Sequence, residues 1–197
     1  MSQRAPFSAV LDPHTELRLL VPVDAPALFD VITRNRDFLN RRVRWSSGVL
    51  TLADTQALID TAAHKAATGD GFHAAIWQRG VLAGGLLCHF INRISLKTEV
   101  GYWLGKNFTG QGLATRACVA GLAYLFEAER LHRVEIQCGV DNLPSRAIPE
   151  RLGFLQEGIK RESEWVTDRY VDHVVYSMLD REWAERREGL LALLKRT

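Results

Sequence analysis

The stretch from residue 96 to residue 140 constrains the fold most, because its hydrophobic period changes twice. Leu96 to Leu104 is a β-rich run that leads through a glycine-rich turn into a segment with apolar residues at helical spacing, from about Gly112 to Arg130. Val134 to Val140 is again rich in β-formers. Two strands joined by one long helix are usually parallel neighbours. The middle of the chain is therefore predicted to hold a parallel strand pair.

The rest of the chain adds strands and helices on either side of this pair. Further strands are predicted at Glu16 to Val21, Phe72 to Gln78, Val81 to Ile91, Phe154 to Lys160 and Tyr170 to Leu179. Helices are predicted from an Asp24 cap to Asn35, from Arg36 to Val43, from a Thr51–Asp54 capping box to before Gly69, from Pro144 to Leu152, and from Asp180 to Leu194. We expect an α+β fold, with a mixed, mostly antiparallel sheet of about seven strands and helices on both faces.

Length and composition indicate one soluble domain. The 197 residues, 47% hydrophobic and 24% charged, suit a single domain over 1–197, in which 1–13 form a loose N-terminal arm. A net charge of +2 predicts no nucleic-acid or membrane partner. The three cysteines and six histidines lack metal-ligand spacing, so we expect free thiols and no metal. Without a signal peptide or a long apolar run, a cytoplasmic location is expected.

The glycine-rich turn within Glu99 to Thr115 has the features of an anion site. Glycines let the backbone approach a ligand, and the unpaired N–H groups and positive dipole end of the following helix face the same point. The turn is not a Walker loop, because no Lys follows Gly110 or Gly112. It fits a dinucleotide fingerprint poorly, since Thr115 replaces the third glycine and Glu129 precedes the next strand.

Two motifs in this order resemble the GNAT superfamily of N-acetyltransferases. Gly112 and Ala114 occupy the last positions of its acetyl-CoA motif Q/R-x-x-G-x-G/A, with Thr109 where Gln or Arg is usual. Asn142 to Phe154 is similar to its N-x-x-S…LGF element. Within the superfamily, the chain is most similar to the RimJ/RimL-type enzymes, which modify the N-termini of ribosomal proteins.

The resemblance implies an acetyl-CoA-dependent transfer of an acetyl group to a primary amine, by direct attack in a ternary complex. The acceptor it implies is a protein or peptide N-terminal α-amino group, and a homodimer is compatible with it. Asn142 would hydrogen-bond the coenzyme A arm, and Ser145 would contact it. The pyrophosphate would be bound by backbone groups of Gly110, Gln111, Gly112, Leu113, Ala114 and Thr115. The pantetheine would be bound by backbone groups of Tyr102, Trp103 and Leu104.

The resemblance implies catalytic roles but does not decide which residue is the general base. Glu164 lies where related enzymes carry a proposed base, and Glu99 lies near the base position of other GNAT branches; either could act through water, and we prefer Glu164. Ser145 occupies the position of the proposed general acid, and we expect it to hydrogen-bond the leaving sulfur. Cys138 could form a mixed disulfide with coenzyme A.

Simpler interpretations stand beside these roles. The glycines can form an ordinary turn before a helix, Asn142 and Ser145 can be helix caps, and lone carboxylates are usually solvated. The arginines between Arg34 and Arg44 form either a solvated face or a border of the acceptor channel that prefers an acidic peptide. Other functions that fit are acetylation of a small-molecule amine (a polyamine, amino acid or antibiotic), a non-catalytic acyl-CoA-binding module, and a nucleotide-binding domain.

Overall fold

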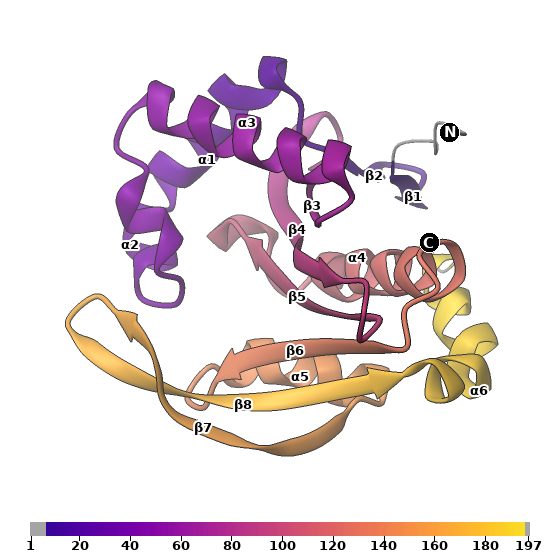
Figure 1. The fold of residues 1–197 in the computed structure, drawn as a ribbon. Coiled ribbons are helices and arrows are strands. Elements are labelled where there is room, and N and C mark those ends of the chain that lie inside the picture. The colour runs from indigo at the N-terminus through magenta and orange to yellow at the C-terminus, as the bar shows by residue number, and fades with distance from the viewer. Residues whose placement is uncertain (1–6, 196–197) are drawn as a thin grey trace.

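One open sheet runs through the computed structural model, which describes residues 7–195 (Figure 1). Its eight strands lie in the order β1-β2-β3-β4-β5-β6-β8-β7, and every neighbouring pair is antiparallel except β5 and β6, which are parallel as predicted. The strands are β1 (Ser8–Asp12), β2 (Thr15–Leu19), β3 (Phe72–Gln78), β4 (Val81–Asn92), β5 (Lys97–Leu104), β6 (Arg133–Gly139), β7 (Leu155–Val166) and β8 (Arg169–Leu179). The mixed, mostly antiparallel α+β fold is thus confirmed.

The sheet has one strand more than the sequence predicted, at its N-terminal edge. Residues 8–12, which were assigned to a loose arm over 1–13, form β1 and pair with β2. The strand is held in place because Leu11 is fully buried against the core. Residues 1–6 of the predicted arm lie outside the described residues.

The helices agree with the predicted order, with differences at their ends. They are α1 (Ala25–Arg34), α2 (Arg36–Asn40), α3 (Leu52–Thr68), α4 (Leu113–Ala123), α5 (Leu143–Leu152) and α6 (Asp180–Leu191). Short 3-10 turns occupy Pro22–Asp24, Trp45–Gly48, Lys106–Phe108 and Ala192–Leu194, and a π turn over Tyr124–Ala128 follows α4. The predicted helix to Arg130 therefore leaves α-helical geometry after Ala123.

Two predicted helix caps had different outcomes. At α3, the Asp54 amide donates to Thr51 Oγ1 at 3.2 Å and the Thr51 amide donates to Asp54 Oδ2 at 2.8 Å, which confirms the capping box. The prediction that Asp24 caps α1 is wrong. Both carboxylate oxygens of Asp24 accept from the Arg18 guanidinium, at 2.7 and 2.9 Å, so this side chain ties α1 to β2 instead.

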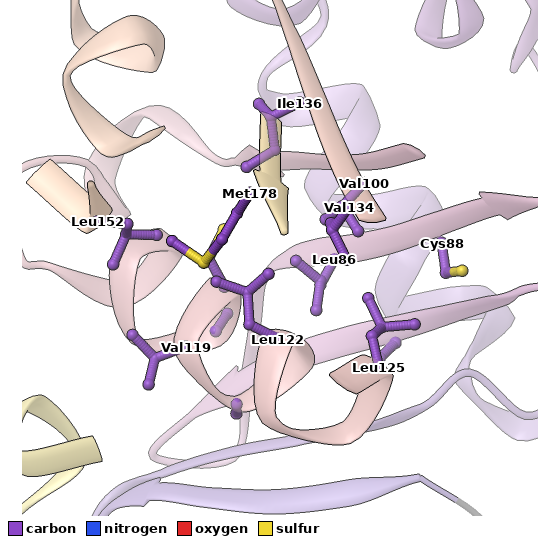
Figure 2. Close-up of a cluster of buried hydrophobic side chains, with 14 of the residues drawn as sticks. Leu86, Cys88, Val100, Val119, Leu122, Leu125, Val134, Ile136, Leu152 and Met178 are labelled. Atoms are coloured by element: carbon purple, nitrogen blue, oxygen red, sulfur yellow. The ribbon is translucent and has the colours of Figure 1, made fainter. Parts of the chain in front are cut away.

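Helices cover both faces of the sheet (Figure 1). One apolar cluster joins α1 and α3 to the face of β3, β4 and β5 that carries Ala75, Leu82 and Trp103. The other, larger cluster lies between the opposite face and α4, α5 and α6. Figure 2 shows part of it, where Val119 and Leu122 of α4 lie near Leu86 of β4 and Met178 of β8.

The parallel pair β5–β6 is hydrogen-bonded only at its start. Lys97 to Glu99 are in register with Arg133 to Glu135, and beyond them the two strands separate into a wedge, while each keeps its antiparallel partner on the other side. In Figure 1, β5 and β6 diverge toward the left of the view. This wedge exposes a strand edge inside the protein, where backbone groups lack a sheet partner.

The β7–β8 hairpin curves past the wide end of the wedge (Figure 1). Its turn reaches α2, where Thr167 Oγ1 donates to the Asn40 carbonyl at 2.9 Å. Strand β7 extends to Val166, so Glu164, which lies beyond the predicted strand Phe154 to Lys160, is part of the strand. None of the helices between residues 7 and 195 combines the length and the hydrophobicity that a membrane span requires.

Candidate active site

A pocket of about 370 Å³ occupies the wedge and reaches the start of α4. The glycine-rich turn forms one end of it: Gly110 and Gly112 have φ angles of +76° and +72°, a left-handed conformation that favours glycine. Gly112 is the N-cap residue and has no side chain to satisfy the first amides of the helix. The pocket therefore ends at free N–H groups and at the positive end of the α4 dipole.

Most residues predicted to hold coenzyme A line this pocket. They are Tyr102, Trp103, Leu104, Gly110, Gly112, Leu113, Ala114, Thr115, Asn142 and Ser145. Gln111 is the exception: its side chain donates to the Asn107 carbonyl at 3.0 Å and bonds Gln78, away from the pocket. Their contacts with the coenzyme stay a prediction, because proximity to a pocket is not binding.

An arginine of α4 holds the glycine-rich turn in place. Arg116 Nη1 donates to the Gln111 carbonyl at 3.3 Å, and its Nη2 pairs with Asp12 Oδ2 at 3.0 Å. Asp12 is the last residue of β1, so the strand missed in the sequence helps to hold the turn. Burial acts to raise the pKa of Asp12, but the hydrogen bond from the His14 amide, together with the smaller effects of the charge and hydrogen bond of Arg116, outweighs it and lowers that pKa.

Two cations that were not predicted to bind coenzyme A also line the pocket. Arg42 follows α2, and Arg151 lies near the end of α5, where its Nη1 donates to Thr115 Oγ1 at 3.2 Å. A bidentate, permanently charged guanidinium suits phosphate oxygens. Arg42 belongs to the arginine cluster considered as a border of the acceptor channel, and Arg151 lies at an unspecified position of the N-x-x-S…LGF element. The three-dimensional fold brings both to the wedge.

The free edge of β5 supplies backbone donors to the same pocket. The Gly105 amide donates to the Ala83 carbonyl of β4 at 2.8 Å. Since N–H directions alternate along a strand, the amides of Tyr102 and Leu104 face the wedge. They are placed to pair with an extended amide-containing ligand as an added strand would.

A tyrosine spans the wedge at the point where a proline interrupts α5. Pro149 has no N–H to give to the Ser145 carbonyl, its partner four residues earlier in the helix. That carbonyl instead accepts from the Tyr102 hydroxyl at 2.8 Å, so β5 is tied to α5. The helix continues through Pro149 to Leu152, and a polar bond across the site replaces the lost one.

Ser145 and Cys138 lie side by side next to Tyr102. Ser145 Oγ is 3.3 Å from Cys138 Sγ and 3.4 Å from the Tyr102 hydroxyl oxygen. The Asn142 side chain makes no cap hydrogen bond to α5, although the residue stands at the N-cap position, so the capping interpretation of Asn142 is wrong. Burial raises the pKa of the Cys138 thiol, which disfavours the thiolate.

A second pocket of about 220 Å³ adjoins the first and contains the predicted acid–base residues. Glu99, Glu164, Ser145 and Cys138 all line it. Glu99 accepts from Gln137 Nε2 at 2.6 Å, and burial raises the pKa of its carboxyl group. The structure thus brings both candidate bases and the serine to one cavity, although their roles stay predictions.

A histidine missed in the sequence faces the same cavity. His173 of β8 lines it, and its Nε2 is 3.6 Å from Glu164 Oε2. Burial lowers the pKa of His173, which favours a neutral imidazole near pH 7. No local motif marks His173, since only the β6–β8 register, which sets it opposite Gly139, brings it to the site.

Polar groups also border the cavity on the side of the β7–β8 turn. Arg41 and Arg42 line a neighbouring polar hollow with Asp168, Arg169 and His173. The arginine cluster therefore reaches the site at these two residues. Among residues 7–195, no group of three or more His, Cys, Asp or Glu side chains is arranged to hold a metal ion.

Comparison with known sequences defines the family. The Acetyltransferase (GNAT) domain family matches residues 14–155, more than half of the chain. The chain is 36% identical over 179 residues to the putative ribosomal N-acetyltransferase YdaF of Bacillus subtilis, covering 90% of this chain and 97% of that protein. It is 26% identical over 164 residues to the ribosomal-protein-serine acetyltransferase of Escherichia coli, covering 83% and 92%.

Solved structures agree with this assignment. RimL, a ribosomal L7/L12 alpha-N-protein acetyltransferase, in complex with coenzyme A gives a TM-score of 0.82 at 26% identity, covering 85% of this chain and 94% of that one; there the coenzyme forms a disulfide with a cysteine of the enzyme. MccE, a microcin C7 self-immunity acetyltransferase in complex with acetyl-CoA and AMP, gives 0.81 at 25% identity, covering 86% and 94%.

The chain therefore belongs to the GNAT family of acetyltransferases. It is an N-acetyltransferase with acetyl-CoA as its cosubstrate, and the predicted similarity to the RimJ/RimL-type enzymes is confirmed.

A first prediction concerns the glycine-rich turn. Gly110→Ala forces a side chain into a left-handed conformation, which costs about 1–2 kcal/mol, and shifts the amides that face the pocket. We expect the Kd for coenzyme A, measured by calorimetric titration, to rise about tenfold. Gly80→Ala is the matched control, because Gly80 has a φ of +77° and the same open surroundings in the β3–β4 turn. An equal Kd in both variants would contradict the assignment.

A second prediction concerns the bond between Tyr102 and α5. Tyr102→Phe leaves the Ser145 carbonyl without its donor and should lower the free energy of unfolding by about 1–3 kcal/mol. Pro149→Ala restores an N–H that can bond the same carbonyl within the helix. Tyr102→Phe should therefore cost less in the Pro149→Ala background, as measured by a double-mutant cycle in denaturant unfolding. Additive effects would show that the two residues do not share this carbonyl.

Proposed function

We propose that this enzyme acetylates the N-terminal α-amino group of a protein or peptide, of the ribosomal-protein type. The observation that carries the proposal is the pair of joined pockets: one ends at the α4 amides, and the other holds two carboxylates and Ser145. The similarity to YdaF and to the serine acetyltransferase of Escherichia coli supports this acceptor class. A ribosomal-protein acceptor would place the enzyme in the cytoplasm.

In this proposal, the larger pocket holds acetyl-CoA. The pyrophosphate binds the amides from Gly110 to Thr115, with Arg151 close enough to add charge. The pantetheine arm runs along the free edge of β5 and pairs with the backbone of Tyr102 and Leu104. Asn142, whose side chain makes no helix-cap bond, is available to hydrogen-bond the same arm.

The reaction is attack of a neutral amine on the thioester carbonyl. A nitrogen–carbon bond forms, the carbonyl oxygen gains negative charge, and the carbon–sulfur bond then breaks to release the coenzyme A thiolate. A β5 amide that faces the wedge can stabilise that oxygen by a hydrogen bond. The proton of the amine leaves to a base in the second pocket.

Deprotonation of an α-amino acceptor at pH 7 costs little free energy, so a weak base is sufficient. Deprotonating a group with a pKa near 7.8 costs about 1 kcal/mol at pH 7, against about 4.6 kcal/mol for a lysine. Glu164 is assigned as this base, directly or through water, because it is partly exposed at the acceptor side and lies beside the weakly basic His173. The raised pKa of Glu99 makes it the second candidate.

Ser145 is assigned to the leaving group. The coenzyme A thiol is close to cysteine in acidity, with a pKa of about 8.5, so its thiolate leaves without a strong acid. Ser145 Oγ, next to Cys138 Sγ, is placed to hydrogen-bond that sulfur. Exchange of Cys138 with a coenzyme A disulfide would release one coenzyme A thiol and leave a mixed disulfide.

A small-molecule amine is the alternative acceptor. MccE, which shares the fold at 25% identity, is a self-immunity acetyltransferase. The same coenzyme half-site would serve either acceptor class.

A thiol-release screen tests the proposed function. With acetyl-CoA present, peptides that begin with Ser or Ala should release coenzyme A thiol faster than lysine side chains, polyamines or amino acids, because their amines are more often neutral. Mass spectrometry should place the acetyl group on the α-nitrogen. Faster release with a small amine would favour the alternative, and no thiol release with any of the amines would favour an acyl-CoA-binding module.

If Glu164 is the base, its loss should lower turnover without weakening coenzyme binding. Glu164→Gln should lower kcat by about 10²–10⁴-fold, as expected for loss of a general base, and leave the Kd for coenzyme A nearly unchanged. Glu99→Gln is the matched control. If Glu99 were the base, its raised pKa would move the acidic limb of the kcat–pH profile above that of an ordinary glutamate, and Glu99→Gln would remove this limb. An unaltered kcat in Glu164→Gln would contradict the assignment.

A further inference from the structure

A third cavity, of about 210 Å³, lies between the sheet and the helices α1 and α3. Its walls are mostly apolar and come from several elements: Leu28 of α1, Leu58 of α3, Leu87 of β4, Trp103 of β5 and Trp45 of the 3-10 turn after α2. The two indoles meet edge to face, with ring centroids 5.3 Å apart. None of the functions assigned above uses this cavity.

Small residues on neighbouring strands leave the space for it. Gly84, Gly85 and Ala75 line the floor where larger side chains would fill the cavity. A Cβ at Gly85 would lie 2.8 Å from Trp103 Nε1, so the glycine lets the indole lie against the sheet. The cavity is therefore built by close packing around it and is large enough for an aromatic or branched side chain, since a cavity of about 150 Å³ holds benzene.

Polar groups at the cavity discriminate by charge. Lys65 of α3 lines it and donates from Nζ to the His89 carbonyl at 2.9 Å. Burial first, then His89 and Lys65, lower the pKa of His73 to about 4, so this imidazole stays neutral at pH 7. An apolar group is accepted by such walls, whereas a second cation would face the Lys65 ammonium without a counter-charge.

The cavity adjoins the acceptor side of the active site. Trp45, Leu87, His89 and Trp103 line both this cavity and the pocket that holds Glu99 and Glu164. Leu87 pairs with Gly101 across β4 and β5, which places it at the junction of the two spaces. A group that enters the third cavity would thus lie beside the pocket that holds the two candidate bases.

We propose that this cavity binds an apolar side chain in the first two residues of the acceptor and excludes a cationic one. The inference rests on the proposed function, because it takes the acceptor to be a peptide with a reacting α-amine. It adds the substrate class, which neither the carboxylates nor the coenzyme pocket specifies.

Two pairs of otherwise identical peptides test the proposal. In one pair, the first residue is Ser and the second is Leu or Lys; in the other pair, the first residue is Leu or Lys. For at least one position, kcat/KM should favour Leu by about tenfold or more, the range that an apolar pocket provides. The position that shows the preference identifies the residue that enters the cavity. Equal kcat/KM for Leu and Lys at both positions would overturn the proposal and leave the acetyltransferase activity intact; no turnover of any peptide would instead remove the proposed acceptor.

Variants connect that preference to the cavity. Leu87→Trp fills the junction and should bring the Leu-to-Lys ratio close to one, while the Kd for coenzyme A is unchanged because Leu87 does not line the coenzyme pocket. Val81→Trp is the matched control, since Val81 lies on the same strand, is 56% exposed and lines none of these cavities. It should keep the wild-type ratio.

Lys65→Met gives an independent test if Leu87→Trp does not fold. Removing the ammonium should raise kcat/KM for the Lys peptides about tenfold and change that for the Leu peptides little. An unchanged ratio in Lys65→Met, or in folded Leu87→Trp, would show that the preference arises elsewhere.

Discussion

The separation of β5 from β6 beyond Glu99 is the constraint on which the site depends. A parallel pair that stayed hydrogen-bonded would fill its own backbone donors and acceptors and leave no room for a ligand. Because the pairing stops, the Tyr102 and Leu104 amides face a cavity instead of a neighbouring strand. Buried backbone groups without partners are costly, so the wedge favours a ligand that has amides of its own.

Two helices, α4 and α5, supply further groups to the site between the separated strands. The α4 helix starts at a left-handed glycine, and its first amides are free for an anion. The α5 helix contains Pro149, which releases the Ser145 carbonyl to the Tyr102 hydroxyl. The carbonyl that lacks its helical hydrogen bond thus links α5 to β5 across the site. This link helps to place Ser145 beside Cys138.

Local patterns predicted most of the fold, because most elements here are specified locally. The capping box at Thr51, the hairpin strands and the crossover around α4 all follow from short-range signals. Strand β1 was missed because five residues, with Leu11 as the buried anchor, give little periodicity. Asp24 was misassigned because its partner, Arg18, comes from the neighbouring strand.

The site was predictable where a motif or the family resemblance indicated it. The glycine-rich turn, Asn142 and Ser145 lie in local sequence patterns, and the structure sets them around one pocket. His173 and Arg151 were not assigned to the site from the sequence, and only strand register and helix docking bring them there. The third cavity could not be predicted either, since its space comes from small residues on β3 and β4 that face α1 and α3.

Amide hydrogen exchange with and without coenzyme A tests whether the coenzyme binds in the wedge and at the start of α4, because it reports on backbone N–H groups one by one. We expect slower exchange at Leu113 to Thr115 and at Tyr102 and Leu104 when the coenzyme binds, with little change in β1 or α3. Unchanged exchange at these amides with saturating coenzyme would show that it binds elsewhere.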